Sequence, residues 1–231
     1  MKELKVIAHI HTDMPEKFGI PRQSGIVKSL TGRIVFEPEF RSFDAVKGIE
    51  EFSHLWLLWE FEGVPQDRFN ATVRPPRLGG NETMGVFATR SPFRPNPIGL
   101  SSVKLEGVEK TADGPVIVVS GIDLRDNTPI FDIKPYLAYA DSHADAKDGF
   151  AGAHVYEQLE VVLPTELKPS FDENDIETVL GLLREDPRPH YQNDPDRVYG
   201  MSFKNLNIKF KVQANTLTIV GVEKNGTKEV T

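Results

Sequence analysis

Cysteine is absent from the 231-residue chain. Its absence excludes disulfide bonds, thiolate metal sites and cysteine nucleophiles, and it favours a cytoplasmic protein. No apolar run approaches the roughly 20 residues that cross a bilayer. The N-terminal residues also lack the apolar core and cleavage site of a signal peptide. We therefore expect no membrane partner.

Motifs of several enzyme classes are missing too. No G-x-G-x-x-G follows a strand pattern and opens a helix, so the doubly wound nucleotide-binding fold is not supported. No G-x-S-x-G is present, and a serine hydrolase is equally unsupported. His9 and His11 would share a strand face, but two histidines without a third ligand are weak evidence for a metal site. We expect no metal.

The charge is distributed unevenly along the chain. A net charge of −7 argues against non-specific nucleic-acid binding, which depends on clustered Lys and Arg. Between Arg68 and Arg94, however, five arginines stand against one acid, Glu82. A basic patch on an acidic protein favours a selective contact with RNA. The alternative is that these arginines pair with the acids of residues 141–185.

The pattern of apolar residues predicts a mainly β protein. The nearly continuous apolar run 52–61 predicts a central strand covered on both faces. Ser42 could cap a short helix. Many short strands with few helices suggest a barrel or a sandwich. The other expected strands cover residues 6–10, 32–36, 86–89, 100–105, 115–120 and 128–133.

A second unit is expected at the C-terminal end. We predict a first domain over residues 1–145, a linker over 146–169 and a small α+β domain over 170–231. Ser170-Phe-Asp-Glu173 has the form of a capping box before an amphipathic helix that Pro187 ends. Alternation on both sides of Asn215 predicts a hairpin.

The most informative segment runs from Arg74 to Gly99, where prolines, glycines and arginines crowd together. Proline fixes φ, and glycine permits close approach of a backbone to a ligand. Arg74, Arg77, Arg90 and Arg94 supply planar cations that suit anions. The alternative interpretation is a proline-stiffened connection with solvated arginines.

This segment, with Pro21-Arg22-Gln23 before it and Asp132-Ile-Lys-Pro-Tyr136 after it, resembles the TrmO family, also called YaeB or TsaA-like proteins. The resemblance runs in register from about Ile7 to Asp141 and continues more weakly through Asp186-Pro-Arg-Pro189. It implies a β-barrel tRNA methyltransferase that uses S-adenosylmethionine and acts on N6 of threonylcarbamoyladenosine next to the anticodon. It also implies a homodimer, with each cofactor site among loops at one barrel end, near the subunit boundary.

The same resemblance implies a set of cofactor-binding residues. Glu62 and Asp123 have a chemical rationale as acceptors for ribose hydroxyls or the cofactor amino group, whereas a solvated strand end is the alternative. The full set is Pro21, Arg22, Gln23, Phe61, Glu62, Arg90, Leu100, Ser120, Gly121, Ile122 and Asp123.

Asp132, Lys134 and Tyr136 form the candidate catalytic group. They alternate with period two, so they would project from one face of an extended strand. Lys134 could bind the threonyl carboxylate, and a plain Asp132–Lys134 ion pair is the alternative. The expected substrate-binding residues are Arg74, Arg77, Arg94, Lys134 and Arg188.

Three further expectations concern single side chains. Arg188 should be exposed on a proline-bracketed turn, reaching toward tRNA or the partner subunit, unless that turn is only a helix stop. His54 should be a hydrogen-bonded core residue. Trp56 and Trp59 cannot share a strand face.

A non-catalytic barrel that binds RNA or nucleotides is the alternative function, and a methyltransferase for small molecules is a third.

Overall fold

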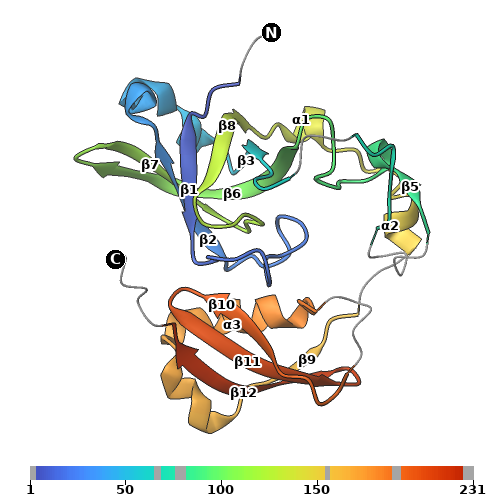
Figure 1. Ribbon diagram of the computed structural model, residues 1–231. Coiled ribbons are helices and arrows are strands. Elements are labelled where there is room, and N and C mark those ends of the chain that lie inside the picture. Colours follow the sequence, from blue (N-terminus) through green and yellow to red (C-terminus); the bar gives the residue numbers. More distant parts are fainter. Residues whose placement is uncertain (1–3, 65–68, 76–81, 154–156, 189–193, 226–231) are drawn as a thin grey trace.

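The computed structural model describes residues 4–64, 69–75, 82–153, 157–188 and 194–225. These residues form a β-barrel and a second, smaller sheet with a helix beside it (Figure 1). None of the helices in the described ranges is both long and apolar enough to span a membrane. The mainly β fold with a barrel, predicted from the sequence, is confirmed.

Six antiparallel strands close the barrel. Antiparallel neighbours turn back at each end, so the connections gather into two loop clusters at opposite barrel ends. In the order in which they neighbour one another, the strands are β1 (Ala8–Thr12), β2 (Thr31–Phe36), β7 (Gly114–Ser120), β6 (Ile98–Thr111), β3 (His54–Glu60) and β8 (Thr128–Pro135).

Strand β3 shows how the barrel buries its core. Leu55, Leu57 and Trp59 face inward and are buried, whereas Trp56 on the outer face is half-exposed. A barrel strand buries only its inner face fully, because the closed sheet encloses a single core. The prediction that this strand is covered on both faces is therefore wrong. His54 also lies on the outer face, bonded to Ser53, and is not a core histidine.

Shorter elements lie between the strands. Residues 86–89, predicted as a strand, form the 3-10 helix η5 (Val86–Ala88), and only β5 (Met84–Gly85) pairs, with β4 (Thr72–Val73). Ser42 caps a short helix as predicted from the sequence, and this helix is η2 (Phe43–Val46); the Ser42 hydroxyl accepts a hydrogen bond from the Asp44 N–H. The remaining short helices are η1 (Pro38–Phe40), η3 (Ile49–Glu51), α1 (Ala138–Asp141) and α2 (Phe150–Ala153).

The second sheet begins inside the segment predicted as a linker. β9 (Glu160–Val162) pairs in parallel with β12 (Thr216–Lys224), and the 3-10 helix η6 (Thr165–Ser170) follows it. β10 (Tyr199–Phe203), β11 (Leu206–Gln213) and β12 form an antiparallel meander that contains the predicted hairpin. The helix α3 (Glu173–Arg184) begins after Asp172 without a side-chain cap, so the capping box predicted at Ser170 is wrong.

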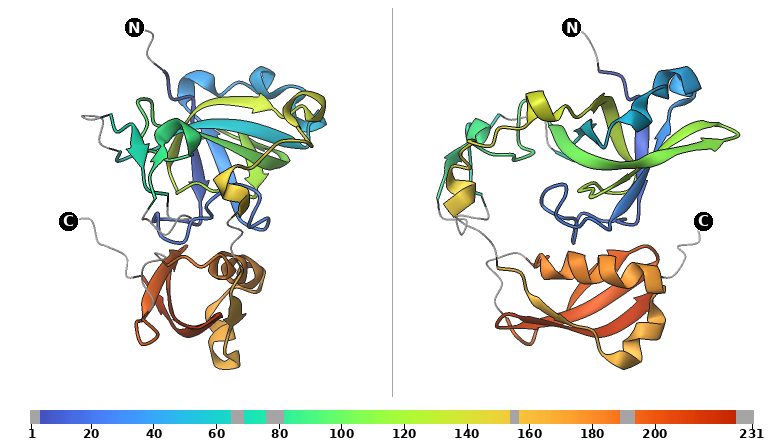
Figure 2. Two further views of the ribbon diagram at one scale, coloured as in Figure 1. Left: turned by 90° about the vertical axis from the view of Figure 1, so that its right-hand side faces the viewer. Right: turned by 180° about the vertical axis from the view of Figure 1, so that it is seen from behind.

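The second sheet contacts the barrel through the loop that follows β1. The Lys204 N–H donates to the Asp13 carbonyl at 2.8 Å. Gly19 adopts φ +92°, and its Cα lies so close to the Met201 side chain that a Cβ would clash there. Figure 2 shows this loop at the boundary between the two parts. The second sheet therefore supports the barrel loop that follows β1.

Candidate functional site

A cavity of about 520 Å³ opens at the barrel end where β1, β3 and β7 finish and where β6 and β8 begin. Its size falls in the range of small-molecule sites. Four chain segments line it: the loop after β1 (Lys17, Ile20, Pro21, Arg22, Gln23), the end of β3 (Trp59 to Glu62, and Val64), the segment leading into β6 (Thr89, Arg90, Pro92, Arg94, Ile98 to Leu100) and the loop before β8 (Asp123, Leu124, Arg125, Thr128).

Asp123 is a partly buried carboxylate of the cavity lining. The Ser101 hydroxyl donates to its Oδ1 at 2.6 Å, and Ser101 itself accepts a 2.9 Å hydrogen bond from Trp59 Nε1. Burial raises the pKa of Asp123, against the opposing effects of the Ser101 hydroxyl, the Ser24 backbone and the Arg90 charge. This carboxylate is poised to accept hydrogen bonds from a ligand.

Glu62 forms an ion pair with Arg125 at 2.5 Å, between the β3 wall and the loop before β8. Lys17 Nζ donates to the Glu62 backbone carbonyl at 2.8 Å, which ties the loop after β1 to the same point. Both charged side chains of the ion pair are about one-third exposed. Glu62 thus lines the cavity, but part of its hydrogen-bonding capacity is already used by Arg125.

Arg90 and Gln23 connect opposite walls, since Arg90 Nη1 donates to Gln23 Oε1. Arg22 Nη2 donates to the Asp186 carbonyl of the second sheet's part at 3.1 Å. The aromatic rings of Trp59 and Phe61 lie 4.3 Å apart at the cavity. The structure therefore brings together, from distant segments, Pro21, Arg22, Gln23, Phe61, Glu62, Arg90, Leu100 and Asp123 of the predicted cofactor set.

Ser120, Gly121 and Ile122 do not line the described cavity. Ser120 donates to Glu106 at 2.5 Å, and Ile122 is fully buried in the barrel core. Gly121 adopts φ +69°, and its carbonyl accepts from the Gly25 N–H at 2.7 Å. A Cβ at Gly121 would lie a tight 3.3 Å from the Gly25 Cα, and the positive φ also favours glycine there. The three residues directly precede Asp123 in the chain but do not face the cavity themselves.

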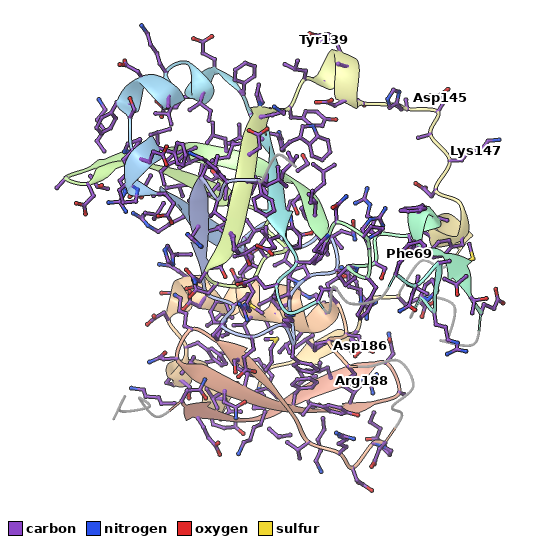
Figure 3. All side chains as sticks on the ribbon, turned by 45° about the horizontal axis from the view of Figure 1, so that its top comes forward. Phe69, Tyr139, Asp145, Lys147, Asp186 and Arg188 are labelled. Atoms are coloured by element: carbon purple, nitrogen blue, oxygen red, sulfur yellow. The ribbon has the colours of Figure 1, made fainter. Side chains whose placement is uncertain are left out.

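Arg188 is not exposed as predicted, since only 11% of its side chain is accessible. Its guanidinium forms two parallel hydrogen bonds with Asp186, at 2.8 and 2.9 Å, and this contact raises the pKa of Arg188. Figure 3 labels the two side chains next to each other. The pair fixes the turn whose carbonyl accepts from Arg22, so Asp186 connects Arg188 to the cavity wall.

Asp132, Lys134 and Tyr136 lie together, but outside the described cavity lining. Asp132 and Lys134 share the outer face of β8 and form an ion pair at 2.8 Å, and the Tyr136 ring lies 5.6 Å from Trp56. Across neighbouring strands, Asp132 lies opposite Leu58, and Leu58 lies opposite Leu100, which lines the cavity. The outer face of the barrel thus links this group to the cavity mouth.

The predicted substrate arginines occupy different places. Arg94 lines the cavity, where its Nη1 donates to the carbonyls of Val86 at 3.2 Å and Thr89 at 2.7 Å. Arg74 is exposed after β4, apart from the described lining. Arg77 lies outside the described residues. No group of three or more His, Asp or Glu residues suited to a metal occurs within the described ranges.

Sequence reasoning missed Lys17, Ser101 and Arg125. Arg125 sits two residues after Asp123, but nothing in its local sequence signals the ion pair with Glu62, which lies 63 positions away. Ser101 could have been found from strand periodicity, since it shares the inner face of β6 with Gly99 and Val103. Nothing in the local sequence of Lys17 signals its contact with Glu62, which lies 45 positions away.

Fold and cavity define a β-barrel protein with a cavity among the loops at one barrel end. The tRNA-methyltransferase O N-terminal domain matches residues 9–142, and the TrmO C-terminal domain matches residues 157–225. The chain belongs to the TrmO family.

Two curated relatives and one solved structure illustrate the similarity. The Escherichia coli protein named tRNA (adenine(37)-N6)-methyltransferase is 38% identical over 218 residues, which is 91% of this chain and 93% of that protein. A Pseudomonas aeruginosa protein, whose name proposes an S-adenosylmethionine-dependent methyltransferase, is 40% identical over 210 residues, or 87% and 89% of the two chains. The crystal structure of TrmO from Pseudomonas aeruginosa superposes with a TM-score of 0.77 at 31% identity, covering 96% of this chain and 99% of that one.

Proposed function

We propose that this protein transfers a methyl group from S-adenosylmethionine to N6 of adenine 37 in tRNA. The observation that carries the proposal is the cavity at the barrel end, with Asp123 partly buried in its wall and Arg90 beside it. A relative named for this reaction matches 91% of the chain.

The donor set of the cavity fits the cofactor. Asp123 and Glu62 supply carboxylate acceptors for an amino group or ribose hydroxyls. Phe61 and Trp59 supply aromatic surface for an adenine ring. Arg90 supplies a fixed cation for the carboxylate of an amino acid. The volume of about 520 Å³ suits a ligand of that size.

S-adenosylmethionine supplies a methyl carbon that is already electrophilic, so alignment of the acceptor nitrogen carries most of the rate. The residues of this chain act by positioning. Contacts between opposite walls, from Arg90 to Gln23 and from Lys17 to Glu62, hold the cavity in one shape. Pre-organised walls of this kind lower the cost of ordering the ligand.

On the acceptor side, we assign Asp132, Lys134 and Tyr136 to the modified adenosine. Lys134 binds the carboxylate of the threonylcarbamoyl group and exchanges its present partner, Asp132, for it. The ion pair is largely exposed, with 62% of the Lys134 side chain accessible, so the exchange costs little. Arg74, Arg77 and Arg94 add positive charge along the segment that meets the RNA.

The proposal includes the assembly and the place of action. A homodimer closes the open side of each cavity, and closed two-fold dimers are the commonest homo-oligomers. Light scattering at assay concentration tests this, and a fully active monomer contradicts it. Because tRNA is the proposed substrate, we place the reaction in the cytoplasm.

One experiment separates the enzyme from a non-catalytic RNA-binding barrel. Purified protein is titrated calorimetrically with S-adenosylmethionine, and tRNA nucleosides are then analysed by mass spectrometry after incubation with both. We expect micromolar cofactor binding and a methyl group on adenine 37. Asp123→Asn should weaken both, whereas Asp113→Asn, in an exposed turn, should change neither. Absence of cofactor binding by the unaltered protein contradicts the proposal.

A further inference from the structure

Two aromatic rings stand exposed near the cavity without a structural role in the core. Phe87 is 71% accessible and Phe69 is 57% accessible. Their ring centroids lie 6.1 Å apart, with an angle of 27° between the ring planes. Figure 3 labels Phe69 on the segment that projects from the barrel. Exposed apolar surface made of paired aromatic rings is typical of a binding site.

The local fold holds this pair in place. The pairing of β4 with β5 brings the chain after Phe69 beside the chain before Phe87. The Val86 N–H donates to the Ala71 carbonyl at 2.9 Å, and the Val86 side chain is 1% exposed. Because Val86 takes the buried position of the short helix η5, its neighbour Phe87 is directed to solvent. The exposure of Phe87 is therefore built into the fold.

Arg94 connects the aromatic pair to the cavity. Its guanidinium carbon lies 5.7 Å from the centroid of the Phe87 ring, within cation–π range. Hydrogen bonds to the carbonyls of Val86 and Thr89 fix the guanidinium there. The same Arg94 lines the cavity. The exposed rings thus stand one side chain away from the proposed methyl-donor site.

Charge decides which occupant fits. The sequence between Arg68 and Arg94 contains five arginines and one acid, a local charge of +4 on a chain of −7. Aromatic rings beside arginines are the usual platform for unpaired bases, because the rings stack on the base and the cations meet the phosphates. We propose that Phe69 and Phe87 form a stacking platform for an unpaired base that flanks the target adenine in the RNA.

The proposal rests on the proposed function, since it takes tRNA as the substrate. Its consequence is that substrate recognition begins outside the cavity, on the anticodon loop beside the reacting base. A stacking contact is sensitive to the loss of an aromatic ring and tolerant of which base stacks. An ordinary apolar contact with a protein would accept leucine in place of phenylalanine.

The test compares Phe87→Leu with Phe87→Trp, using a tRNA anticodon stem-loop as the probe. Phe87→Leu should weaken stem-loop binding and lower kcat/KM for tRNA about tenfold, as expected for one lost base stack. Its calorimetric affinity for S-adenosylmethionine should stay unchanged. Phe87→Trp should retain activity, and the additional tryptophan emission should be quenched when the stem-loop is added. Phe43→Leu, at an exposed phenylalanine of η2, is the matched control and should behave as the unaltered protein.

The outcomes separate the possibilities. Normal stem-loop affinity in Phe87→Leu, with no quenching in Phe87→Trp, overturns the platform. If Phe87→Leu instead changes the mass in solution and leaves RNA affinity intact, the rings belong to a subunit contact and the proposal is equally overturned. Quenching requires only RNA binding, so it tests the platform even if the unaltered protein fails to methylate tRNA, a result that would refute the proposed function alone.

Discussion

Ser101 and Asp123 form a 2.6 Å hydrogen bond between the inner face of β6 and the loop before β8. Ser101 is 1% exposed and cannot turn away, because Trp59 Nε1 donates to its oxygen from β3. The hydroxyl must therefore donate to the carboxylate. Two barrel strands in this way fix the orientation of one cavity carboxylate.

Replacing Ser101 with Ala should make cofactor binding more sensitive to acid. Burial already raises the pKa of Asp123, and the Ser101 hydroxyl opposes that shift. Without the hydroxyl the pKa rises further, so the ionised acceptor is lost at a higher pH. Calorimetric titrations at a series of pH values should show the loss of S-adenosylmethionine affinity moving toward neutral pH. Ser102→Ala, on the outer face of the same strand, is the control and should leave the pH profile in place.

Arg90→Ala should weaken cofactor binding without unfolding the protein. Arg90 is exposed and joins Gln23 across the cavity, so little core packing depends on it. Loss of a charged hydrogen bond predicts a fall in affinity or rate of about tenfold to a hundredfold. Arg33→Ala removes an exposed ion pair with Glu109 on the barrel side and should not affect binding. A folded Arg90→Ala protein with normal binding and turnover would remove Arg90 from the site.

Asp13 should make the docking of the two parts depend on pH. Burial raises its pKa, Asp175 and Asp126 raise it further, and Lys204 lowers it. A carboxyl whose folded-state pKa is raised stabilises the fold while it is protonated, and that stability is lost as pH rises through the raised value. Asp13→Asn carries no charge at any pH. Its melting temperature relative to the unaltered protein should therefore be higher at neutral pH than at acid pH. A difference that stays constant with pH would contradict this.

The sequence predicted much of the fold because barrel strands follow local rules. Period two placed Trp56 and Trp59 on opposite faces, and the structure places Trp59 inside and Trp56 outside. The hairpin around Asn215 followed from alternation and turn chemistry. Residues 86–89 failed as a strand because their hydrogen bonding is helical: the Thr89 N–H donates to the Val86 carbonyl at 3.2 Å and closes the short helix η5. Tertiary contacts overrode the local propensity there.

The cavity was predictable only where motif resemblance supplied residues. Pro21, Arg90 and Asp123 come from three distant segments, and no local pattern shows that they converge. The counter-ion of Glu62 remained hidden for the same reason, and strand periodicity places Ser101 on the inner face of β6 without showing that it bonds to Asp123. The burial of Arg188 was also missed. Its partner Asp186 lies only two residues away, but the proline-bracketed turn that carries both residues suggested an exposed side chain.

The last prediction concerns Lys134, which we expect to recognise the carboxylate of the threonylcarbamoyl group. A site that offers an ammonium for a substrate carboxylate discriminates against substrates that lack this partner. In the structure Lys134 pairs with Asp132 at 2.8 Å on the outer face of β8, outside the described cavity lining. Lys134→Met should therefore lower methylation of modified tRNA while S-adenosylmethionine affinity stays nearly intact.

Two measurements made in parallel decide the role of Lys134. Calorimetry reports cofactor binding, and single-turnover methylation is followed on tRNA with and without the threonylcarbamoyl group. Lys104→Met provides the control, because Lys104 lies on the outer face of β6, 58% exposed and paired with Glu106 in a comparable ion pair. Lys134→Met should lose the preference for modified tRNA, since only that substrate brings the carboxylate, whereas Lys104→Met should keep it. If Lys134→Met methylates modified tRNA at the normal rate, or loses cofactor binding to the same extent, the lysine serves the ion pair with Asp132 and not the substrate.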